Sequence, residues 1–268
     1  MSTHTPFSAL LWDGHAFAPA ESVPLTDRGF RYGVSLFESF PVRAGSALFL
    51  DEHIASLRHA CAVAGLAIPR GALEACGGAL RHAPDGFGRI HLTGGDGTVT
   101  EAFDHCRVLL SVESREGVPA RVYHRGYDLG IHAAGYVPVF PGLKTGNYWP
   151  NLLAFREGVA QQRNETLLFS PAGHLVSACM ANVFLVVGGK LTTPALATGA
   201  RPGIVRKWVL ERTHAEETLL NRAEVERATD IFLTSSWLGI MPVASLEGRP
   251  LTDRAVSASL LVQYRTLT

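Results

Sequence analysis

The sequence predicts an α/β protein made of two parts: an α+β first half and a β-rich α/β second half. Runs of apolar and aromatic residues bounded by turn-forming residues, typical of strands, occur in both halves. Runs with helical spacing follow Asp51 and Tyr148. The polar stretch Glu113 to Gly117 interrupts the pattern, so we expect a first domain at 1–118 and a second at 119–268.

The composition is that of a globular protein without an excess of either charge. Among 268 residues, 47% are hydrophobic, which is enough to bury a large core. Lys plus Arg and Asp plus Glu number 24 each, so no overall field attracts nucleic acid or an anionic membrane. Small acidic substrates can still bind through local arginines.

Neither export nor a metal site is predicted. No run approaches the roughly 20 apolar residues of a membrane span, and the polar start Ser2 to Thr5 lacks the layout of a signal peptide. The four cysteines include no C-x-x-C pair, which is typical of reduced thiols. His91, His105 and His124 show no metal spacing, and we expect them to be structural or surface residues. The expected location is the cytoplasm.

Turn-forming residues and periodicity place the elements of the first half. Asp13-Gly14 after the strand-like run Phe7 to Trp12 predicts a hairpin, because this dipeptide tolerates the positive φ of a tight turn. Leu36 to Val42 is the next expected strand. We expect Asp51 to cap a helix that ends at Gly65.

Weaker patterns lead into the second half. They predict a helix over Gly71 to His82 and strands at Arg89 to Thr93 and Cys106 to Val112, with the strand-like pattern resuming at Ala120 to His124. Beyond that point the expected elements are a helix over Tyr148 to Gln162, hairpins turning at Pro171 to Gly173 and at Gly188-Gly189, a helix over Gly203 to Thr213 and a strand at Asp230 to Leu233.

Lys144 is the first candidate for chemistry. In Leu143-Lys144-Thr145-Gly146-Asn147-Tyr148 the lysine leaves an apolar run just before a turn and a new helix. An amine placed in this way can escape full hydration, lose basicity and attack a carbonyl carbon. Lysines are mostly surface residues, so the surrounding pattern decides the interpretation.

A candidate anion site lies further along the chain. Gly203, Ile204 and Val205 begin a helix just after Pro202, so backbone N–H groups and the helix dipole point at any anion bound there. Thr234 and Ser235 follow an expected strand and offer hydroxyl donors.

Together these segments resemble the fold type IV pyridoxal phosphate (PLP) enzymes, which include branched-chain aminotransferases, D-amino acid aminotransferases and aminodeoxychorismate lyases. The signature Asp27-Arg28-Gly29-Phe30-Arg31-Tyr32-Gly33, followed by Phe37-Glu38, matches the same family, and the resemblance runs from Asp27 to Pro242. It implies a two-domain α/β fold of the D-amino acid aminotransferase type, bound PLP and a homodimer.

The resemblance also implies a role for each matching residue. Lys144 would be the Schiff-base lysine, with Tyr148 near the ring hydroxyl of the cofactor. The other implied cofactor-binding positions are Ser56, Ser177, Asn182, Gly203, Ile204, Val205, Thr234 and Ser235. Phe37, Arg28, Arg31 and Tyr32 would line the substrate side.

Three positions depart from the family pattern. Ser56 stands where the family has an arginine that clamps the phosphate, and Arg58 lies about 100° further around a helix. Ser177 replaces the glutamate that keeps the pyridine nitrogen protonated, which weakens the ring as an electron acceptor. Val205 replaces a threonine. The loop Thr93 to Gly97 also lacks the family's arginine, so Arg28, Arg31 or Arg43 is expected to bind a substrate carboxylate, unless the substrate is not a conventional amino acid.

The function implied is that of a PLP-dependent aminotransferase acting on a small amino compound. Aminodeoxychorismate cleavage is the alternative that suits the short chain. A divergent member with altered or lost PLP use is a further reading, favoured by Ser56 and Ser177. A catalytically inactive scaffold is the last, and the retained Lys144 argues against it.

Overall fold

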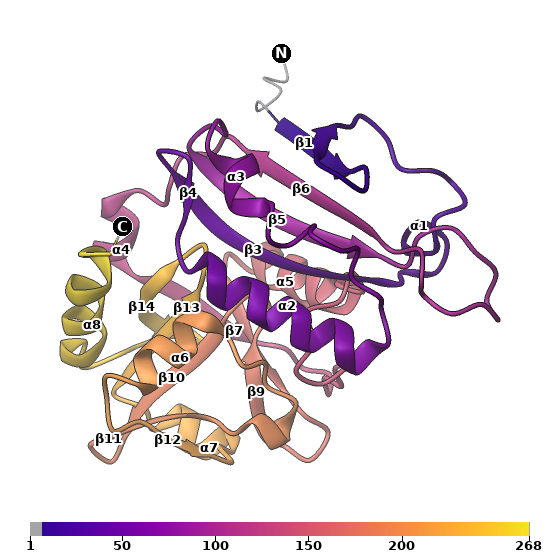
Figure 1. Ribbon diagram of the computed structural model, residues 1–268. Coiled ribbons are helices and arrows are strands. Elements are labelled where there is room, and N and C mark those ends of the chain that lie inside the picture. The colour runs from indigo at the N-terminus through magenta and orange to yellow at the C-terminus, as the bar shows by residue number, and fades with distance from the viewer. Residues whose placement is uncertain (1–6, 268) are drawn as a thin grey trace. The chain divides into compact units, whose positions relative to one another are not determined.

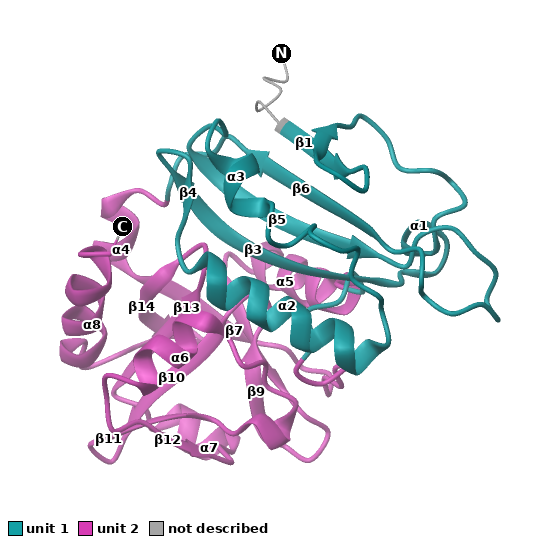
Figure 2. Cartoon of the chain, viewed as in Figure 1, with its two compact units in different colours: residues 1–117, 143–147 teal, residues 118–142, 148–268 magenta. Residues whose placement is uncertain are grey.

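The computed structural model describes residues 7–267, so the polar start Ser2 to Thr5 lies outside the described residues. The chain forms two compact units (Figure 2). Their residues are 1–117 and 143–147 in unit 1, and 118–142 and 148–268 in unit 2. The segment around Lys144, which the sequence assigns to the second domain, thus belongs to unit 1.

Unit 1 contains a six-stranded antiparallel sheet with the strand order β2-β1-β6-β5-β3-β4 (Figure 1). Its strands are β1 (Phe7–Trp12), β2 (Phe17–Pro19), β3 (Ser35–Arg43), β4 (Ser46–Ala47), β5 (Gly86–Thr93) and β6 (Arg107–Glu113). The hairpin predicted at Asp13-Gly14 joins β1 to β2. The strands predicted from Leu36, Arg89 and Cys106 are confirmed as β3, β5 and β6.

The helices of unit 1 are α1 (Arg28–Tyr32), α2 (Leu50–Ala64) and α3 (Cys76–Leu80). Helix α2 lies along one face of the sheet, where alternate residues of β3 such as Leu36 and Phe40 pack with Leu57. Side chains of the neighbouring positions, including Phe37, therefore point to the opposite face. This alternation separates the core of unit 1 from the candidate site.

The ends of α2 confirm one expectation and correct another. Gly65 ends the helix in the left-handed conformation, with a φ of 70°. Asp51 is not the N-cap, because the helix begins at Leu50 after Phe49, whose φ is 57° and which makes no side-chain cap. Asp51 lies in the first turn, where its charge still favours the helix dipole.

Two weaker predictions are also corrected. The helix expected over residues 71–82 is the short α3. Ala120 to His124 is not a strand but helix α4 (Ala120–Arg125), because one helical turn packs Val122 and Tyr123 against the core of unit 2. The Tyr123 hydroxyl donates to the Leu238 carbonyl at 2.9 Å, which anchors this turn.

Unit 2 contains a nine-stranded mixed sheet with the order β12-β11-β10-β13-β14-β7-β8-β9, and β15 pairs with β14. Its strands are β7 (Tyr127–Ile131), β8 (Glu165–Phe169), β9 (Leu175–Ala178), β10 (Asn182–Val187), β11 (Lys190–Pro194), β12 (Glu216–Thr218), β13 (Asp230–Ser235), β14 (Gly239–Leu246) and β15 (Arg249–Pro250). The two predicted hairpins are confirmed as β8–β9 and β10–β11.

The α-helices of unit 2 are α4, α5 (Trp149–Ala160), α6 (Ile204–Leu210), α7 (Arg222–Glu226) and α8 (Ala255–Arg265), with a 3₁₀ turn at Leu196–Thr198. Helices α5 and α6 confirm the helices predicted after Tyr148 and Gly203, each shorter than expected. The core of unit 2 is apolar and includes Leu129, Leu167, Val183, Ile231 and Met241.

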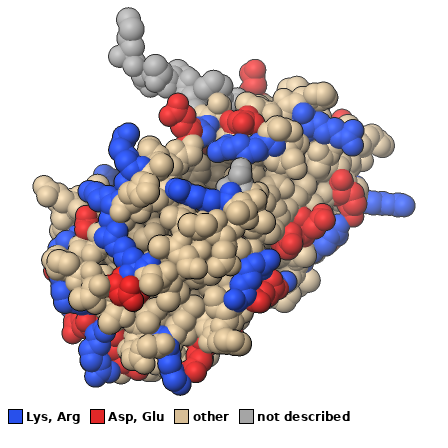
Figure 3. Space-filling view, turned by 90° about the vertical axis from the view of Figure 1, so that its left-hand side faces the viewer, with Lys and Arg blue, Asp and Glu red and all other residues tan. Residues whose placement is uncertain are grey.

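The surface agrees with the balanced composition. On the face drawn in Figure 3, basic and acidic side chains are interspersed. None of the helices within residues 7–267 is long and apolar enough to cross a membrane. The four cysteines are buried and free of disulfides.

Candidate functional site

The Lys144 segment is attached to the first residues of β3. Thr145 forms an isolated antiparallel bridge with Leu36. The Phe37 amide donates to the Lys144 carbonyl oxygen at 2.9 Å. The backbone of Lys144 is therefore fixed by main-chain pairing, while its side chain stays partly exposed.

Gly146 and Asn147 explain how this segment approaches β3 so closely. The Gly146 amide donates to the Ser35 carbonyl at 2.9 Å, and a Cβ on Gly146 would collide with the Ser35 hydroxyl. The Asn147 side-chain amide donates to the Gly33 carbonyl at 3.2 Å. Gly33 has a φ of 70°, a conformation that favours glycine. The contacts of Thr145, Gly146 and Asn147 with the residues before and at the start of β3 therefore fix the position of the Lys144 backbone.

The ring of Phe37 contacts two cationic side chains. The Lys144 Nζ lies 4.7 Å from the ring centroid, and the Arg89 Cζ lies 4.6 Å from it. Phe37 is only 6% exposed, so the ring is a firm support. Both contacts are cation–π geometry, which is stronger where water is partly excluded. An amine and a guanidinium are thereby held on the sheet face opposite the core.

His91 lies beside the same ring, because β3 and β5 pair Phe37 with His91. The two ring centroids are 5.4 Å apart. Burial, reinforced by the nearby positive charge of Arg89, lowers the pKa of His91 to about 4. His91 is therefore neutral at neutral pH and adds no positive charge next to Lys144.

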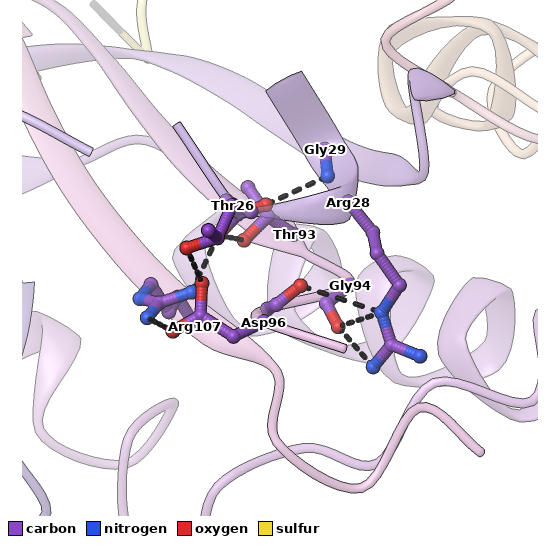
Figure 4. A network of polar contacts seen from close by, with 9 residues as sticks. Thr26, Arg28, Gly29, Thr93, Gly94, Asp96 and Arg107 are labelled. Carbon is purple, nitrogen blue, oxygen red and sulfur yellow. Dashed lines mark hydrogen bonds and ion pairs between the residues drawn. The ribbon is translucent and has the colours of Figure 1, made fainter. Parts of the chain in front are cut away.

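Arg28 does not face a substrate site. It is 1% exposed, and its guanidinium is surrounded by backbone oxygens of the loop that follows β5 (Figure 4). The guanidinium donates to the carbonyls of Gly94, Gly95, Thr98, Glu101 and Ala102. With its donors engaged in this way, Arg28 fixes the loop and has no capacity left for a carboxylate.

Asp27 holds the other side of the same loop. Its carboxylate accepts from the Gly29 amide at 2.6 Å, from the Thr93 hydroxyl at 2.7 Å and from the Arg107 guanidinium at 2.8 Å. Arg107 also pairs with Asp96, which accepts from Thr26 (Figure 4). The Asp27-Arg28 signature is thus a buried framework and not a substrate wall.

Arg31 and Tyr32, the other residues implied on the substrate side, are exposed at the end of α1. The Arg31 guanidinium stacks on the Tyr32 ring at 4.9 Å. Arg43, the third arginine considered for a carboxylate, donates to its neighbour's carbonyl, that of Val42, at 3.0 Å. Of the residues implied on the substrate side, Phe37 contacts Lys144 through its ring.

Ser56 is engaged inside unit 1. Its hydroxyl donates to Glu38 Oε1 at 2.9 Å, while the Nδ1 atom of His53 lies 2.9 Å from Glu38 Oε2. Glu38 and His53 are 2% and 1% exposed, so a buried carboxylate lies where an arginine at position 56 would begin. Arg58 points elsewhere and pairs with Glu74 at the surface, as the helical spacing predicts.

In unit 2, three segments meet at the candidate phosphate loop. Strands β10 and β13 pair Asn182 with Thr234. The Asn182 side-chain amide donates to the Arg201 carbonyl at 2.8 Å, and a Cβ on Gly203 would collide with the Asn182 Oδ1. Thr234 is 1% exposed, and its hydroxyl has no hydrogen-bond partner among the described residues. A buried hydroxyl without a protein partner is unusual, and it leaves a donor for a ligand or a water molecule.

Helix α6 begins at this loop, with Gly203 as an N-cap that makes no side-chain bond. Its first-turn N–H groups have no partner within the helix. Val205 is buried, so the position where the family has threonine offers packing and no hydroxyl. Arg206 donates to the Pro194 carbonyl at 3.0 Å and pairs with Glu217, which ties α6 to the sheet.

The remaining implied residues of unit 2 are placed as follows. Ser235 accepts from the Leu238 amide at 3.1 Å in the turn after β13. Tyr148 is partly exposed and forms the N-cap position of α5. Ser177 lies in β9 opposite Leu168 and is partly exposed.

Each unit carries residues whose chemistry suits one polar end of PLP. The unpartnered Thr234 hydroxyl and the start of α6 suit a phosphate, and the Lys144 amine suits an aldehyde. A serine such as Ser177 could offer a pyridine nitrogen only a neutral hydrogen bond. A PLP ring with only this bond at its nitrogen would withdraw electrons less strongly than a ring whose nitrogen is paired with a carboxylate.

Sequence reasoning missed the role of Arg89 and the buried Glu165. Arg89 was visible as the first residue of a predicted strand, and the period of two would have placed it on the Phe37 face once β3 and β5 were paired. Glu165 begins β8 as the only charged residue in a run that is otherwise apolar or Thr, which is a signal for a buried carboxylate with a specific role.

Comparison with known proteins places this arrangement. The model of the amino-transferase class IV family matches residues 35–246, well over half of the chain. The aminodeoxychorismate lyase of Vibrio harveyi is 25% identical over 241 residues, which cover 85% of this chain and 89% of that protein.

Two solved structures share the fold. The 4-amino-4-deoxychorismate lyase from Pseudomonas aeruginosa has a TM-score of 0.84 and 28% identity, covering 96% of this chain and 98% of that one. The branched-chain amino acid aminotransferase of Escherichia coli has a TM-score of 0.86 at 19% identity, covering 97% and 94%. The fold is therefore fold type IV, and the chain belongs to the amino-transferase class IV family.

Proposed function

We propose that the protein is a PLP-dependent enzyme of class IV that acts on a small amino compound, with Lys144 as its reacting amine. The observation that carries the proposal is the support of the Lys144 Nζ on the Phe37 ring, 4.7 Å from its centroid, with Arg89 on the same ring. The other two lysines, Lys190 and Lys207, form exposed ion pairs with Glu216 and Glu211.

Bound PLP would supply an aldehyde carbon and an electron-withdrawing ring. The backbone of Lys144 is held by its bridge to β3, so its amine can reach a fixed point with little loss of entropy. As a free base the Lys144 amine takes the proton from the carbon that bears the substrate's amino group, and it returns the proton in a later step.

Arg89 is the proposed binder of the substrate carboxylate. Arg28 is excluded from this role by its backbone contacts, whereas the guanidinium of Arg89 is exposed on the sheet face that carries Lys144. Its Nε donates to the Ser39 hydroxyl at 3.3 Å, which orients the planar group. A guanidinium can then grip a carboxylate with two parallel hydrogen bonds.

In unit 2 the proposed cofactor contacts are at the phosphate end and the ring. The Gly203 loop, the first turn of α6 and Thr234 would bind the phosphate, with Asn182 as their support. Ser235 and Tyr148 are proposed beside the cofactor, and Ser177 at its ring nitrogen. The Ser56 hydroxyl donates to Glu38 within unit 1, so Ser56 is not proposed as a direct cofactor contact.

Transamination is the general reaction for such a site. A lyase reaction on an aminodeoxychorismate-like substrate is the second candidate, because the relatives named as lyases match nearly the full length of this chain. The two reactions differ in their need for an acceptor. Consumption of 4-amino-4-deoxychorismate without any 2-oxo acid supports the lyase, and amino transfer that requires a 2-oxo acid supports the aminotransferase.

The test of the proposal is covalent capture of Lys144. We expect the purified protein to take up PLP and to absorb visible light. After borohydride reduction, the covalently attached cofactor is the label, and we expect it on the peptide that contains Lys144. Lys144→Ala should lose both label and turnover, whereas Lys190→Ala should keep both, because Lys190 lies in a surface ion pair. A colourless protein without label, or a label at Lys190 or Lys207, would refute the proposal and favour a scaffold role.

We also propose a cytoplasmic homodimer, as in the family. Unit 1 exposes several large apolar side chains near α1 and the loop after β5, namely Leu25 (75%), Phe30 (71%) and Val99 (74%). Light scattering of the purified protein would measure its mass. A monomer at micromolar concentration would contradict this assignment.

A further inference from the structure

Glu165 is a buried carboxylate that the proposed reaction does not use. It is 3% exposed at the start of β8. Its Oε1 accepts from the amides of Thr166 at 2.9 Å and Cys179 at 3.1 Å. Its Oε2 accepts from the Met180 amide at 3.0 Å. Two of these three donors belong to the short connection between β9 and β10.

That connection is held from its other side as well. The Asn151 side-chain amide, on α5, donates to the Cys179 carbonyl at 2.9 Å, and the Tyr136 hydroxyl donates to Asn151 at 3.1 Å. The Ala178 amide donates to the Ala181 carbonyl at 2.9 Å and closes the turn. The turn Cys179–Ala181 is therefore clamped between a carboxylate and a carboxamide.

The turn joins the residue proposed at the ring nitrogen of the cofactor to the residue proposed to support its phosphate loop. Ser177 lies two residues before it, and Asn182 follows it directly. Asn182 in turn supports the phosphate loop through the Arg201 carbonyl and its close contact with Gly203. A shift of the turn is thus transmitted to the phosphate loop through a single side chain.

We propose that Glu165 is a positioning residue for the cofactor site, whose ionised carboxylate fixes the Cys179–Ala181 turn and thereby holds Asn182 against Gly203. An ionised carboxylate has enough acceptor sites for all three amides, and it accepts them more strongly than a neutral carboxyl group does. When it gains a proton, one oxygen becomes a donor that faces an amide donor, and a bond to the turn weakens. The inference rests on the proposed function in that it names the bound group as PLP.

The surroundings of Glu165 move its pKa into the neutral range. Burial raises the pKa of Glu165 to about 7, and the bonds from Thr166, Met180 and Cys179 oppose the rise. The Cys179 thiol in contact with it stays neutral, since burial and Glu165 raise its pKa.

Burial and hydrogen bonds are the main causes of the shift in the pKa of Glu165. On the elements packed against β8, the charged side chains are Asp128 of β7 and Arg156 and Glu157 of α5. Asp128 accepts from the Ser245 hydroxyl at 2.6 Å, and Glu157 pairs with His132 at 3.0 Å. Arg163 lies in the loop that leads into β8.

Glu165→Gln tests the role with two measurements on the full-length protein. In wild type we expect PLP affinity to fall between about pH 8 and about pH 6 as Glu165 gains its proton. In Glu165→Gln the Kd for PLP should be about tenfold higher at the upper pH and should lose this part of the pH profile. Hydrogen exchange at the amides of Cys179 and Met180, measured without PLP, should become faster in the variant.

Matched variants distinguish a specific effect of Glu165 on the Cys179–Ala181 turn from a general loss of stability. Glu157→Gln changes an exposed glutamate of α5 and should keep the wild-type profile. Asn151→Ser removes the clamp on the Cys179 carbonyl, so it should weaken PLP binding while keeping the pH dependence, and it serves if Glu165→Gln fails to fold. Unchanged exchange and affinity in Glu165→Gln, or equal loss of the pH profile in Glu157→Gln, would overturn the inference. If hydrogen exchange becomes faster in Glu165→Gln but the wild-type protein binds no PLP, Glu165 still fixes the turn and the proposed function is wrong.

Discussion

Two glycine-containing loops, Gly94–Gly97 in unit 1 and Arg201–Gly203 in unit 2, use polar atoms in opposite ways. In the first, the guanidinium of Arg28 is buried and bonded to backbone oxygens (Figure 4). The carboxylate of Asp27 is likewise buried and accepts from Arg107. In the second, the buried Thr234 hydroxyl beside the loop has no protein partner within residues 7–267. A saturated network fixes a shape, whereas an unsatisfied donor beside a helix start is ready for a ligand.

The comparison teaches how to assign an arginine or a hydroxyl from its partners and not from its type. Arg28 lies in the family signature and looks like a substrate residue in the sequence, yet its donors are taken by backbone carbonyls. Arg89 stands outside every motif, yet its guanidinium shares a ring with Lys144.

The largest effect is expected for Arg28→Ala. Removal of the guanidinium leaves several backbone carbonyls of the loop after β5 without their hydrogen-bond donor, so we expect a loss of about 4 kcal/mol in the free energy of unfolding. Urea denaturation measures it. The neighbouring exposed Arg31→Ala should change stability by less than about 0.5 kcal/mol. A loss below about 1 kcal/mol in Arg28→Ala would show that the loop does not depend on this arginine.

Arg89→Gln should have its main effect on substrate binding. Loss of a bidentate contact should raise the KM for a carboxylate substrate by about tenfold or more, equivalent to about 1.4 kcal/mol or more. Stability should change little, since the side chain is exposed. Steady-state kinetics with a substrate and with its carboxamide give the answer, because the variant should lose the preference for the acid. Equal effects on both compounds would remove Arg89 from carboxylate binding.

Thr234→Val sharpens the other side of the comparison. Because its hydroxyl has no protein partner, the substitution should leave the free energy of unfolding unchanged and raise the Kd for PLP about three- to tenfold. Thr193→Val is the matched control in the same sheet. Thr193 is fully buried and donates to the Val183 carbonyl at 2.8 Å, so its loss should lower stability by about 1 kcal/mol and leave PLP affinity unchanged. Reversed results would mean that Thr234 is structural.

Local signals in the sequence predicted local structure well. The Asp13-Gly14 hairpin, the end of α2 at Gly65 and the starts of α5 and α6 depend on a few neighbouring residues, and all are confirmed. The cap at Asp51 was wrong because Phe49 adopts a left-handed conformation that no local preference favours.

The site depends on pairs that are distant in sequence. Lys144 was found from its turn, but its attachment to β3 rests on Thr145 and Leu36, which no local pattern connects. Arg89 and Phe37 share a face only through the register between β3 and β5. The saturation of Arg28 likewise needs the path of the loop after β5. A single sequence reveals which residues are reactive and leaves open which of them face one another.

Because Leu143–Asn147 belongs to unit 1, chimeric proteins made from two relatives must satisfy an additional condition. The chain on both sides of this segment belongs to unit 2, so no single cut yields both units whole. A hybrid that joins the first half of one relative to the second half of another must seat a foreign lysine segment on the edge of its own β3. A hybrid should therefore position its reactive amine correctly only if the residues from its two parents can form the bridge that Thr145 and Leu36 form here.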